Sequence, residues 1–398
     1  MRPMSYASFA LLCAVALARF SNPAPHAKSA SDIDALLKET RLPDGFAISL
    51  YARAPGARSI AVGPQGKAIF IGTGADNRIY VLAPGVDGAS SVGLFASGVD
   101  FDRPHGLCFD DAGSLYVAER NRILRFADAE NNWRKPEKTV VVEKGALIPS
   151  DEESDAHTSR MCRIGPDGKL YVSLGQPYDV APKEKLALYD ETGIGGVVRM
   201  NKDGSARDVF ARGIRNSVGM DFNPADGALW FTDNQSNEMG DDTPPGELNR
   251  APVAGLHFGF PWYGGGHART PEYADEPPPD GVVFPEVEEA PHAADLGMIF
   301  YTGAAFPEKY RGGIFSAQHG SGGREPPLGA RLMFTPVGPD GRAGRSEPFL
   351  EGWNKGVTPY LARPVDVAQT PDGALLVTDD QNGAVYRIRY RPSPIARN

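Results

Sequence analysis

Cysteine is scarce in this sequence, with 3 residues in 398. Neither a C-x-x-C nor a C-x-x-C-H motif occurs, which excludes a zinc ribbon and a covalently attached c-type haem. So few cysteines also exclude a disulfide framework. We expect Cys108 and Cys162 to be small buried thiols, and a single bridge between them is the alternative in an oxidising compartment.

An excess of positive charge is also missing. The chain has 41 Lys and Arg against 50 Asp and Glu, which gives a formal net charge of −9. This balance argues against nucleic acid and against anionic membranes as partners, because both bind basic surfaces. Apolar residues, in contrast, make up 41% of the chain, which is enough for a sizeable core and excludes disorder throughout.

A long apolar run occurs only near the N-terminus. The run "YASFALLCAVALA" (6–18) follows the basic Arg2 and ends in the small-residue site Ala16-Leu17-Ala18. It is shorter than the roughly 20 residues that span a bilayer and is typical of a cleaved secretory signal peptide. A lipoprotein anchor through Cys13 is disfavoured because the preceding Leu12 is not small. We therefore predict a signal peptide over residues 1–18 and a soluble protein that is periplasmic or secreted.

One strand–turn–strand pattern recurs along the rest of the chain. Glycine and proline together form about a fifth of the residues and are spread along the sequence, which is typical of many short elements. Each copy has a short strand, a turn with glycine, and a second strand rich in Val, Tyr and Phe. The copies are "SIAVGPQGKAIFIG" (59–72), "GLCFDDAGSLYVAE" (106–119), "CRIGPDGKLYVSLG" (162–175), "GMDFNPADGALWFTD" (219–233), "MIFYTGAAFPEKYRGGIFSAQ" (298–318) and "VDVAQTPDGALLVTD" (365–379).

The spacing of these copies indicates the fold. The glycines of the first four turns follow one another at intervals of 47, 55 and 59 residues, which suits propeller blades of four antiparallel strands. We predict an all-β, six-bladed β-propeller over residues 42–392, because a pair of β-sandwiches would not explain six similar turns. The strand "FAISLYA" (46–52) is expected to close the ring by joining the last blade. Residues 19–41 are predicted to form a linker with a short helix at 32–40.

The residues that precede the innermost strands of a propeller line one mouth of its central channel. Functional side chains are therefore expected just before each copy of the pattern. The residues with chemistry of their own at these positions are His105, His157, Arg160, Arg215, Asn216 and Arg363.

Several segments resemble the PQQ-dependent aldose dehydrogenases, which include soluble glucose dehydrogenase and the L-sorbosone dehydrogenase-like and pyranose dehydrogenase-like proteins. The segments are "HTSRMCRIGPDGKLYVSLG" (157–175), "GIRNSVGMDFNPADGALWFTDN" (213–234), "GDDTPPGELNR" (240–250), "HFGFPWYGGG" (257–266) and "RPVDVAQTPDGALLVTDD" (363–380), with "PHAADLGMIFYTGAAFPEKYRGGIFSAQHGS" (291–321) similar to the sorbosone branch. The resemblance covers residues 42–390. It implies an exported propeller that holds pyrroloquinoline quinone (PQQ) and Ca²⁺ and oxidises the hemiacetal or hydrated aldehyde carbon of a sugar.

The cofactor-binding set follows from the charge of PQQ. Because PQQ carries three carboxylates, an acidic protein must concentrate cations to hold it, and arginine pairs best with carboxylates. Arg215 and Arg363 occupy mouth positions of different blades. Arg331 is a further candidate, for which a surface ion pair is the alternative. The resemblance implies that Arg215 and Asn216 contact the quinone and that Arg215 polarises the oxygen on which charge develops.

The resemblance makes His157 the general base of the reaction. It lies 10 residues before Asp167, which is the register of the family. A histidine suits this role because its ordinary pKa lies near neutral pH. The glucose-specific members carry an aspartate directly before the base, but Ala156 stands there in this chain. Asp155 would point elsewhere on an extended strand.

The metal site and one wall of the pocket also differ from the family pattern. The resemblance assigns Ca²⁺ to the carbonyls of Gln235 and Ser236. Asp242 and its neighbour Asp241 are alternative ligands or orienting groups, for which a solvated acidic turn is the other interpretation. A lysine of the glucose enzymes aligns with Gln318 or His319, so Gln318 joins the cofactor-binding set. The chain then reads "HGSGGR" (319–324) where the sorbosone branch has HGSWNR, so a tryptophan is missing.

Two other functions remain as alternatives. A metal-dependent propeller lactonase would use side chains such as Asn216, Asp233 and Glu119 around a central cation, although it gives no reason for the arginines. A non-catalytic binding propeller would explain Ala156 and the altered loop. The leading prediction is a sugar dehydrogenase with catalytic His157 and Arg215, which passes electrons to a separate cytochrome or quinone.

Overall fold

The computed structural model describes residues 30–85 and 87–392. The predicted signal peptide (1–18) lies outside these residues, as does the first part (19–29) of the predicted linker (19–41). Across the described ranges, no helix is both long and apolar enough to cross a membrane.

Six antiparallel sheets follow one another along the described chain and form the blades of a β-propeller, as predicted. From the innermost to the outermost strand, blade one contains β2 (Ser59–Val62), β3 (Ile69–Gly72), β4 (Ile79–Ala83) and β5 (Ser91–Leu94); blade two contains β6 (Gly106–Phe109), β7 (Leu115–Ala118), β8 (Ile123–Ala127) and β9 (Glu137–Val142); blade three contains β10 (Cys162–Ile164), β11 (Leu170–Leu174), β12 (Gly196–Met200) and β13 (Asp208–Arg212). Blade four contains β14 (Met220–Phe222), β15 (Leu229–Asp233), β16 (Gly246–Ala251) and β20 (Val287–Glu289); blade five contains β21 (Asp295–Phe300), β22 (Ile314–Gln318), β23 (Arg331–Thr335) and β24 (Glu347–Leu350); blade six contains β25 (Pro364–Gln369), β26 (Leu375–Asp379), β27 (Ala384–Tyr390) and β1 (Phe46–Arg53).

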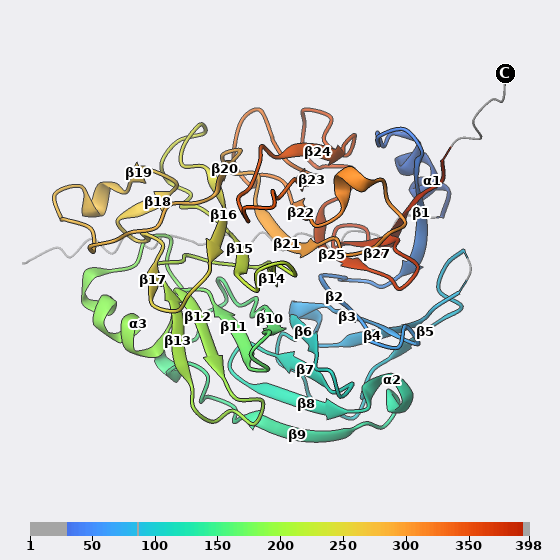
Figure 1. Cartoon of the computed structure of the whole chain (residues 1–398), viewed down its shortest axis with the longest axis horizontal. Helices are drawn as coiled ribbons and strands as arrows, with labels where there is room; N and C mark the ends of the chain where they lie inside the picture. Colours follow the sequence, from blue (N-terminus) through green and yellow to red (C-terminus); the bar gives the residue numbers. More distant parts are fainter. Residues whose placement is uncertain (1–29, 86, 393–398) are drawn as a thin grey trace, which may run out of the picture.

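The blades are arranged around a common centre. Figure 1 shows innermost strands such as β6 and β10 near the middle of the view and outermost strands such as β9 at the rim. The ring closes where β1 pairs antiparallel with β27, from Phe46 opposite Tyr390 to Arg53 opposite Ala384. The prediction that the segment 46–52 joins the last blade is therefore confirmed.

The elements beyond the four strands of each blade are short in the described part of the chain. The helices are α1 (Ala30–Lys38), α2 (Ala129–Asn132) and α3 (Leu186–Thr192), and the 3₁₀ turns are η1 (Gly74–Asp76), η2 (Ser150–Glu152), η3 (Lys183–Lys185), η4 (Pro271–Tyr273) and η5 (Glu308–Tyr310). Strand β17 (Leu256–His257) pairs parallel with β13 as a fifth strand of the blade-three sheet, and β18 (Tyr263–Gly265) and β19 (Ala268–Arg269) form a separate pair. The short helix expected at 32–40 is α1, which begins and ends two residues earlier.

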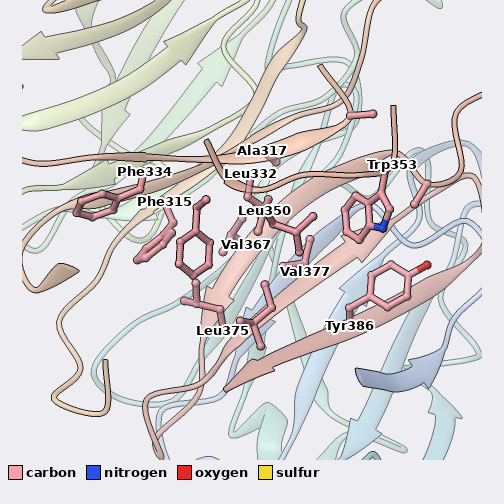
Figure 2. Close-up of a cluster of buried hydrophobic side chains, with 14 of the residues drawn as sticks. Phe315, Ala317, Leu332, Phe334, Leu350, Trp353, Val367, Leu375, Val377 and Tyr386 are labelled. Atoms are coloured by element: carbon pink, nitrogen blue, oxygen red, sulfur yellow. The ribbon is translucent and has the colours of Figure 1, made fainter. Parts of the chain in front are cut away.

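The core lies between neighbouring blades, which explains why the second strand of each blade is rich in apolar residues. Every residue of β11, β15 and β26 is buried, because another blade covers each face of the sheet. Figure 2 shows the cluster between blades five and six, where Phe315 and Leu332 face Val367 and Val377. Ile33 and Leu36 of α1 complete this cluster, so the helix anchors the chain before it enters β1.

Cys108 and Cys162 form a disulfide, so the expectation of two buried thiols is wrong. Cys108 lies on β6 and Cys162 on β10, and their Cα atoms are 5.7 Å apart although 54 residues separate them in the sequence. The bridge joins the innermost strands of blades two and three. This alternative was left open by the sequence, which does not reveal that two innermost strands lie side by side.

Candidate functional site

A cavity of about 530 Å³ lies at the face of the propeller where the innermost strands begin and the second strands end. Residues from blades three, four and five line it, among them His157, Arg215, Asn216, Gln235, Asp241 and Arg324. The structure thus brings together four of the predicted site residues, His157, Arg215, Asn216 and Gln235, which are distant in the sequence.

His157 is held by its backbone and by one ring nitrogen. Its φ of 50° lies in the left-handed region, and Arg160 Nη1 donates to its carbonyl oxygen at 2.8 Å. The ring Nδ1 lies 2.5 Å from the carbonyl oxygen of Gln176. Because a carbonyl only accepts hydrogen bonds, Nδ1 carries the proton and Nε2 carries the lone pair. Burial, and then the nearby Arg215 guanidinium, lower the pKa of His157 to about 4, so the ring is neutral at pH 7.

A glycine allows this close approach between blades three and four. A Cβ on Gly175 would lie 2.6 Å from Asn216 Oδ1, 2.8 Å from the carbonyl oxygen of His157 and 2.9 Å from His157 Cβ. All three distances are too short for ordinary packing. Gly175, directly after β11, therefore permits His157 and Asn216 to share one wall of the cavity.

Arg215 and Asn216 are positioned by a carboxylate at the far end of their hairpin. The backbone N–H groups of Arg215 and Asn216 donate to the two oxygens of Asp233, at 2.8 and 2.7 Å. The Arg215 guanidinium donates to the Asp179 carboxylate at 2.6 Å and to the carbonyl oxygens of Asp179 and Asn234. Asp233 thus fixes the backbone, and Asp179 fixes the direction of the guanidinium.

Asp233 is itself buried next to a second acid. Burial raises the pKa of Asp233 to about 6, although the two backbone N–H groups oppose this shift. Glu247 lies opposite Asp233 on β16, and burial together with the Asp233 charge raises its pKa to about 8. Asp233 thus holds the backbone of two lining residues, Arg215 and Asn216, and Glu247 lies beside Asp233 on the neighbouring strand.

Three buried oxygens around the cavity have no hydrogen-bond partner in the described structure. They are Asn216 Oδ1 and Gln235 Oε1, which belong to lining residues, and Ser236 Oγ, whose fully buried residue follows Gln235 and does not itself line the cavity. The amide nitrogen Nε2 of Gln235 lies 3.1 Å from Nδ1 of His292. An unpaired buried oxygen is costly, so these atoms are suited to a bound group that supplies a donor or a cation.

The other predicted site residues are not among those that line this cavity. Gln318 is fully buried and bonds to Asp295 and to Arg331 Nε, so both predicted residues lie within blade five. Arg363 donates to the carbonyl oxygens of His319 and Gly320. The Asp242 side chain is 92% exposed and pairs with Arg324 at 2.9 Å.

Two of the three donors considered for a lactonase, Asp233 and Glu119, are engaged elsewhere, whereas Asn216 lines the cavity. Asp233 accepts the two N–H groups described above, and Glu119 accepts the Asp102 N–H at 2.8 Å and pairs with Arg122. In the described residues, no group of three or more His, Cys, Asp or Glu side chains is placed to hold a metal ion. A metal here would need backbone, amide or hydroxyl oxygens.

Two features of the site escaped the sequence analysis. The Gln176 carbonyl orients His157, where the glucose-specific members of the resembled family carry an aspartate; Asp155 points elsewhere, as expected, and pairs with Arg103 at 2.7 Å. A backbone carbonyl leaves no mark in a sequence. Arg324 lines the cavity from the loop "HGSGGR", which was noted only for its missing tryptophan.

A family model described as glucose/sorbosone dehydrogenase matches residues 107–387. An uncharacterized protein from Borreliella burgdorferi is 28% identical over 373 residues, which cover 91% of this chain and 93% of that protein.

Several solved structures share the fold. The holo form of the pyranose dehydrogenase PQQ domain from Coprinopsis cinerea is 16% identical, with a TM-score of 0.70, and the match covers 88% of this chain and 97% of that one. The PQQ-bound aldose sugar dehydrogenase from Streptomyces coelicolor is 16% identical, with a TM-score of 0.59 and coverage of 88% and 99%. A family AA12 carbohydrate-active enzyme from Trichoderma reesei is 18% identical, with a TM-score of 0.69 and coverage of 88% and 97%. At these identities the likeness establishes the fold.

Proposed function

The chain belongs to the glucose/sorbosone dehydrogenase family, and from this premise we propose that it is a PQQ-dependent sugar dehydrogenase. Its reaction would oxidise the hemiacetal or hydrated aldehyde carbon of a sugar to a lactone or an acid. Support comes from the neutral, oriented His157 beside Arg215 and Asn216 in one cavity, and this arrangement carries the proposal.

The cavity suits PQQ in size and chemistry. Its volume of about 530 Å³ lies within the usual range of roughly 300–1,000 Å³ for small-molecule sites. Arg215 and Arg324 offer guanidinium groups to the carboxylates, and Asn216 offers an amide. When bound, PQQ supplies a quinone that accepts hydride.

His157 would take the proton from the sugar hydroxyl. With Nδ1 donating to Gln176, Nε2 has a free lone pair directed by a fixed ring. The proton of the substrate O–H bond would pass to Nε2, the hydrogen of the C–H bond on the same carbon would leave as a hydride to the quinone when it is bound, and a C=O bond would form on the substrate. Arg215, held by Asp179, would stabilise the oxygen on which negative charge develops.

A calcium ion would complete the charge balance of the cavity. Among the lining residues of Asp, Glu, Lys and Arg type in the described chain, Arg215 and Arg324 are positive and Asp241 is negative. Because Arg215 already pairs with Asp179 and Arg324 with Asp242, the described lining residues hold no uncompensated positive charge for three carboxylates, and a divalent cation would supply part of it. Asn216 Oδ1, Gln235 Oε1 and Ser236 Oγ are unpaired oxygens of the type that Ca²⁺ prefers. We propose Gln235 and Ser236 as its ligands; Asp242, which pairs with Arg324, would act through that arginine.

The protein is also proposed to be exported and to pass electrons to a separate cytochrome or quinone. The Cys108–Cys162 disulfide supports an oxidising compartment.

Titration with PQQ followed by absorbance tests the cofactor, and dye reduction with a panel of aldoses tests the reaction. We expect saturable uptake that weakens when EGTA removes Ca²⁺. His157→Ala should lower kcat by about 10²–10⁴-fold and leave PQQ uptake unchanged. His267→Ala is the matched control, because His267 is an exposed histidine that pairs with Glu288. Retained activity in His157→Ala would remove that residue from the base role, and lactone hydrolysis without PQQ would favour a hydrolase.

A further inference from the structure

A second cavity, of about 320 Å³, adjoins the first. His157 and Asn216 line both cavities, so they form the boundary between them. Arg58 precedes β2, His105 precedes β6 and Ser159 precedes β10, and all three also line the second cavity. Because these residues stand at the starts of innermost strands in three blades, the second cavity lies on the propeller axis. We call it the axial cavity.

His105 is the unusual residue of the axial cavity. Its side chain is 1% exposed, and neither ring nitrogen has a hydrogen-bond partner in the described structure. A buried polar group without a partner is rare and costs free energy, so such a residue requires an explanation. The first cavity and the base do not provide one, because His105 is not among the residues that line the first cavity.

The backbone around His105 is held by the close packing of three blades. A Cβ on Gly106 would lie 2.0 Å from the carbonyl oxygen of Arg160 in blade three. A Cβ on Gly72 would lie 2.8 Å from the carbonyl oxygen of Pro104. Glycine at both positions lets the strands of blades one, two and three approach closely at this point. The backbone that carries the His105 ring therefore does not have to be ordered when a ligand binds.

The charges around the axial cavity are balanced. Arg58 pairs with Asp380 at 2.5 Å, and Arg103 pairs with Asp155 at 2.7 Å. Burial, and then the Arg58 charge, lower the pKa of His105 to about 3, so its ring is neutral and offers one N–H donor and one acceptor. The hydroxyl groups of Thr158 and Ser159 add to this polar lining. Such a lining suits a neutral molecule with several hydroxyl groups better than an anion.

We propose that the axial cavity is the subsite for the hydroxyl groups of a neutral sugar, and that His105 forms a hydrogen bond with one of them. This proposal rests on the proposed function, because His157 in the shared wall would then meet the carbon that is oxidised. His105 would be a specificity-determining residue: it selects a sugar with a hydroxyl at one particular position and leaves the proton transfer to His157.

Calorimetric titration with sugars tests this proposal, on the protein both without and with PQQ and Ca²⁺. The probes are D-glucose, D-xylose and L-sorbosone, followed by the monodeoxy analogues of whichever binds most tightly. His105→Leu removes both bonding atoms, His105→Gln retains a donor and an acceptor, and His267→Gln is the control at an exposed position. We expect His105→Leu to weaken sugar binding by about tenfold and His105→Gln to restore most of the loss.

Removal of the correct hydroxyl provides the sharper readout. One monodeoxy sugar should bind the wild type about tenfold more weakly and lose nothing further in His105→Leu, because both changes remove the same bond. PQQ uptake should be the same in all variants. Should His105→Leu fail to fold, His105→Gln and the deoxy series on the wild type decide.

Equal sugar affinity in His105→Leu and the wild type would overturn the proposal. So would additive losses of affinity from His105→Leu and from every deoxy sugar, because no single hydroxyl would then bind His105. A lack of sugar binding both without and with PQQ and Ca²⁺ would also overturn it. Failure of the dehydrogenase function is distinguishable, because it would abolish PQQ uptake and dye reduction while sugar binding by the cofactor-free protein persisted.

Discussion

Gly175→Ala is the most direct test of how blades three and four build the cavity. The added Cβ would lie 2.6 Å from Asn216 Oδ1 and 2.8 Å from the carbonyl oxygen of His157. Ordinary contact distances are about 3.5–4.0 Å, so these atoms must retreat by roughly 1 Å. The His157 carbonyl cannot do so freely, because Arg160 donates to it at 2.8 Å. The strain therefore falls on the base and on the amide beside it.

The expected magnitudes follow from this displacement. Overpacking of a well-packed site costs about 1–3 kcal/mol, which urea denaturation would detect as a lower free energy of unfolding. A misplacement of about 1 Å at a reacting group costs on the order of 100-fold in rate, which kcat/KM for dye reduction would detect. PQQ affinity, followed by absorbance, should also fall because Asn216 moves.

Gly98→Ala is the matched control, since a Cβ on Gly98 meets nothing within 4 Å. Its stability, kcat/KM and PQQ affinity should equal those of the wild type. The reasoning is refuted if Gly175→Ala matches Gly98→Ala in all three measurements, because the close approach of the blades would then have no consequence.

Three further predictions concern stability and pH. Replacing Cys108 and Cys162 by alanine opens a loop of 54 residues and should lower the free energy of unfolding by about 4 kcal/mol, measured by urea denaturation with the reduced wild type as a reference. Burial and the Asp233 charge raise the pKa of Glu247 to about 8, so the folded state keeps a proton that the unfolded state releases above about pH 4.5, and the free energy of unfolding should fall as the pH rises to about 8. Glu247→Gln should flatten this fall when urea denaturation is repeated across the pH range. An unchanged dependence of the free energy of unfolding on pH in Glu247→Gln would contradict the prediction. Because the pKa of His157 is lowered to about 4, kcat/KM should fall on the acid side only near pH 4, whereas an acid limb near the ordinary histidine pKa would show that another group controls the base.

The fold could be predicted from the sequence because the same strand–turn–strand pattern recurs from blade to blade. The turn glycine and the largely apolar second strand recur in "GPDGKLYVSL" and "PDGALLVTD", and both β11 and β26 are buried throughout. The disulfide between Cys108 and Cys162 could not be decided in the same way. It depends on two innermost strands of different blades lying side by side, and a separation of 54 residues says nothing about that distance.

The site residues that directly precede an innermost strand could be predicted from the sequence. His157, Arg215 and Asn216 meet in one cavity because blade geometry alone brings such positions together. The orienting group of His157 was not predictable, since any residue at position 176 would supply the same carbonyl. Likewise, the loop that carries Arg324 has no repeat to fix its conformation, so its contribution to the cavity required the structure.

The segments "FTDN" and "VTDD" that helped to indicate the family have a structural role at the ends of their second strands. In blade four, Thr232 Oγ1 donates to the Leu296 carbonyl of blade five at 2.7 Å, while Asp233 receives the backbone N–H groups of Arg215 and Asn216. In blade six, Thr378 Oγ1 donates to the Arg58 carbonyl of blade one, and Asp379 receives the backbone N–H of Arg363. The threonine thus joins one blade to the next, and the aspartate fixes an arginine at the mouth.

A guanidinium positioned in this way needs little reorganisation when a charge develops beside it, which is the condition for strong electrostatic stabilisation. The Thr-Asp pair therefore has a structural role at the site, and the residues whose backbone it holds carry the proposed chemistry. A propeller could keep the pair in both blades and lose its activity through changes at Arg215 or His157 alone.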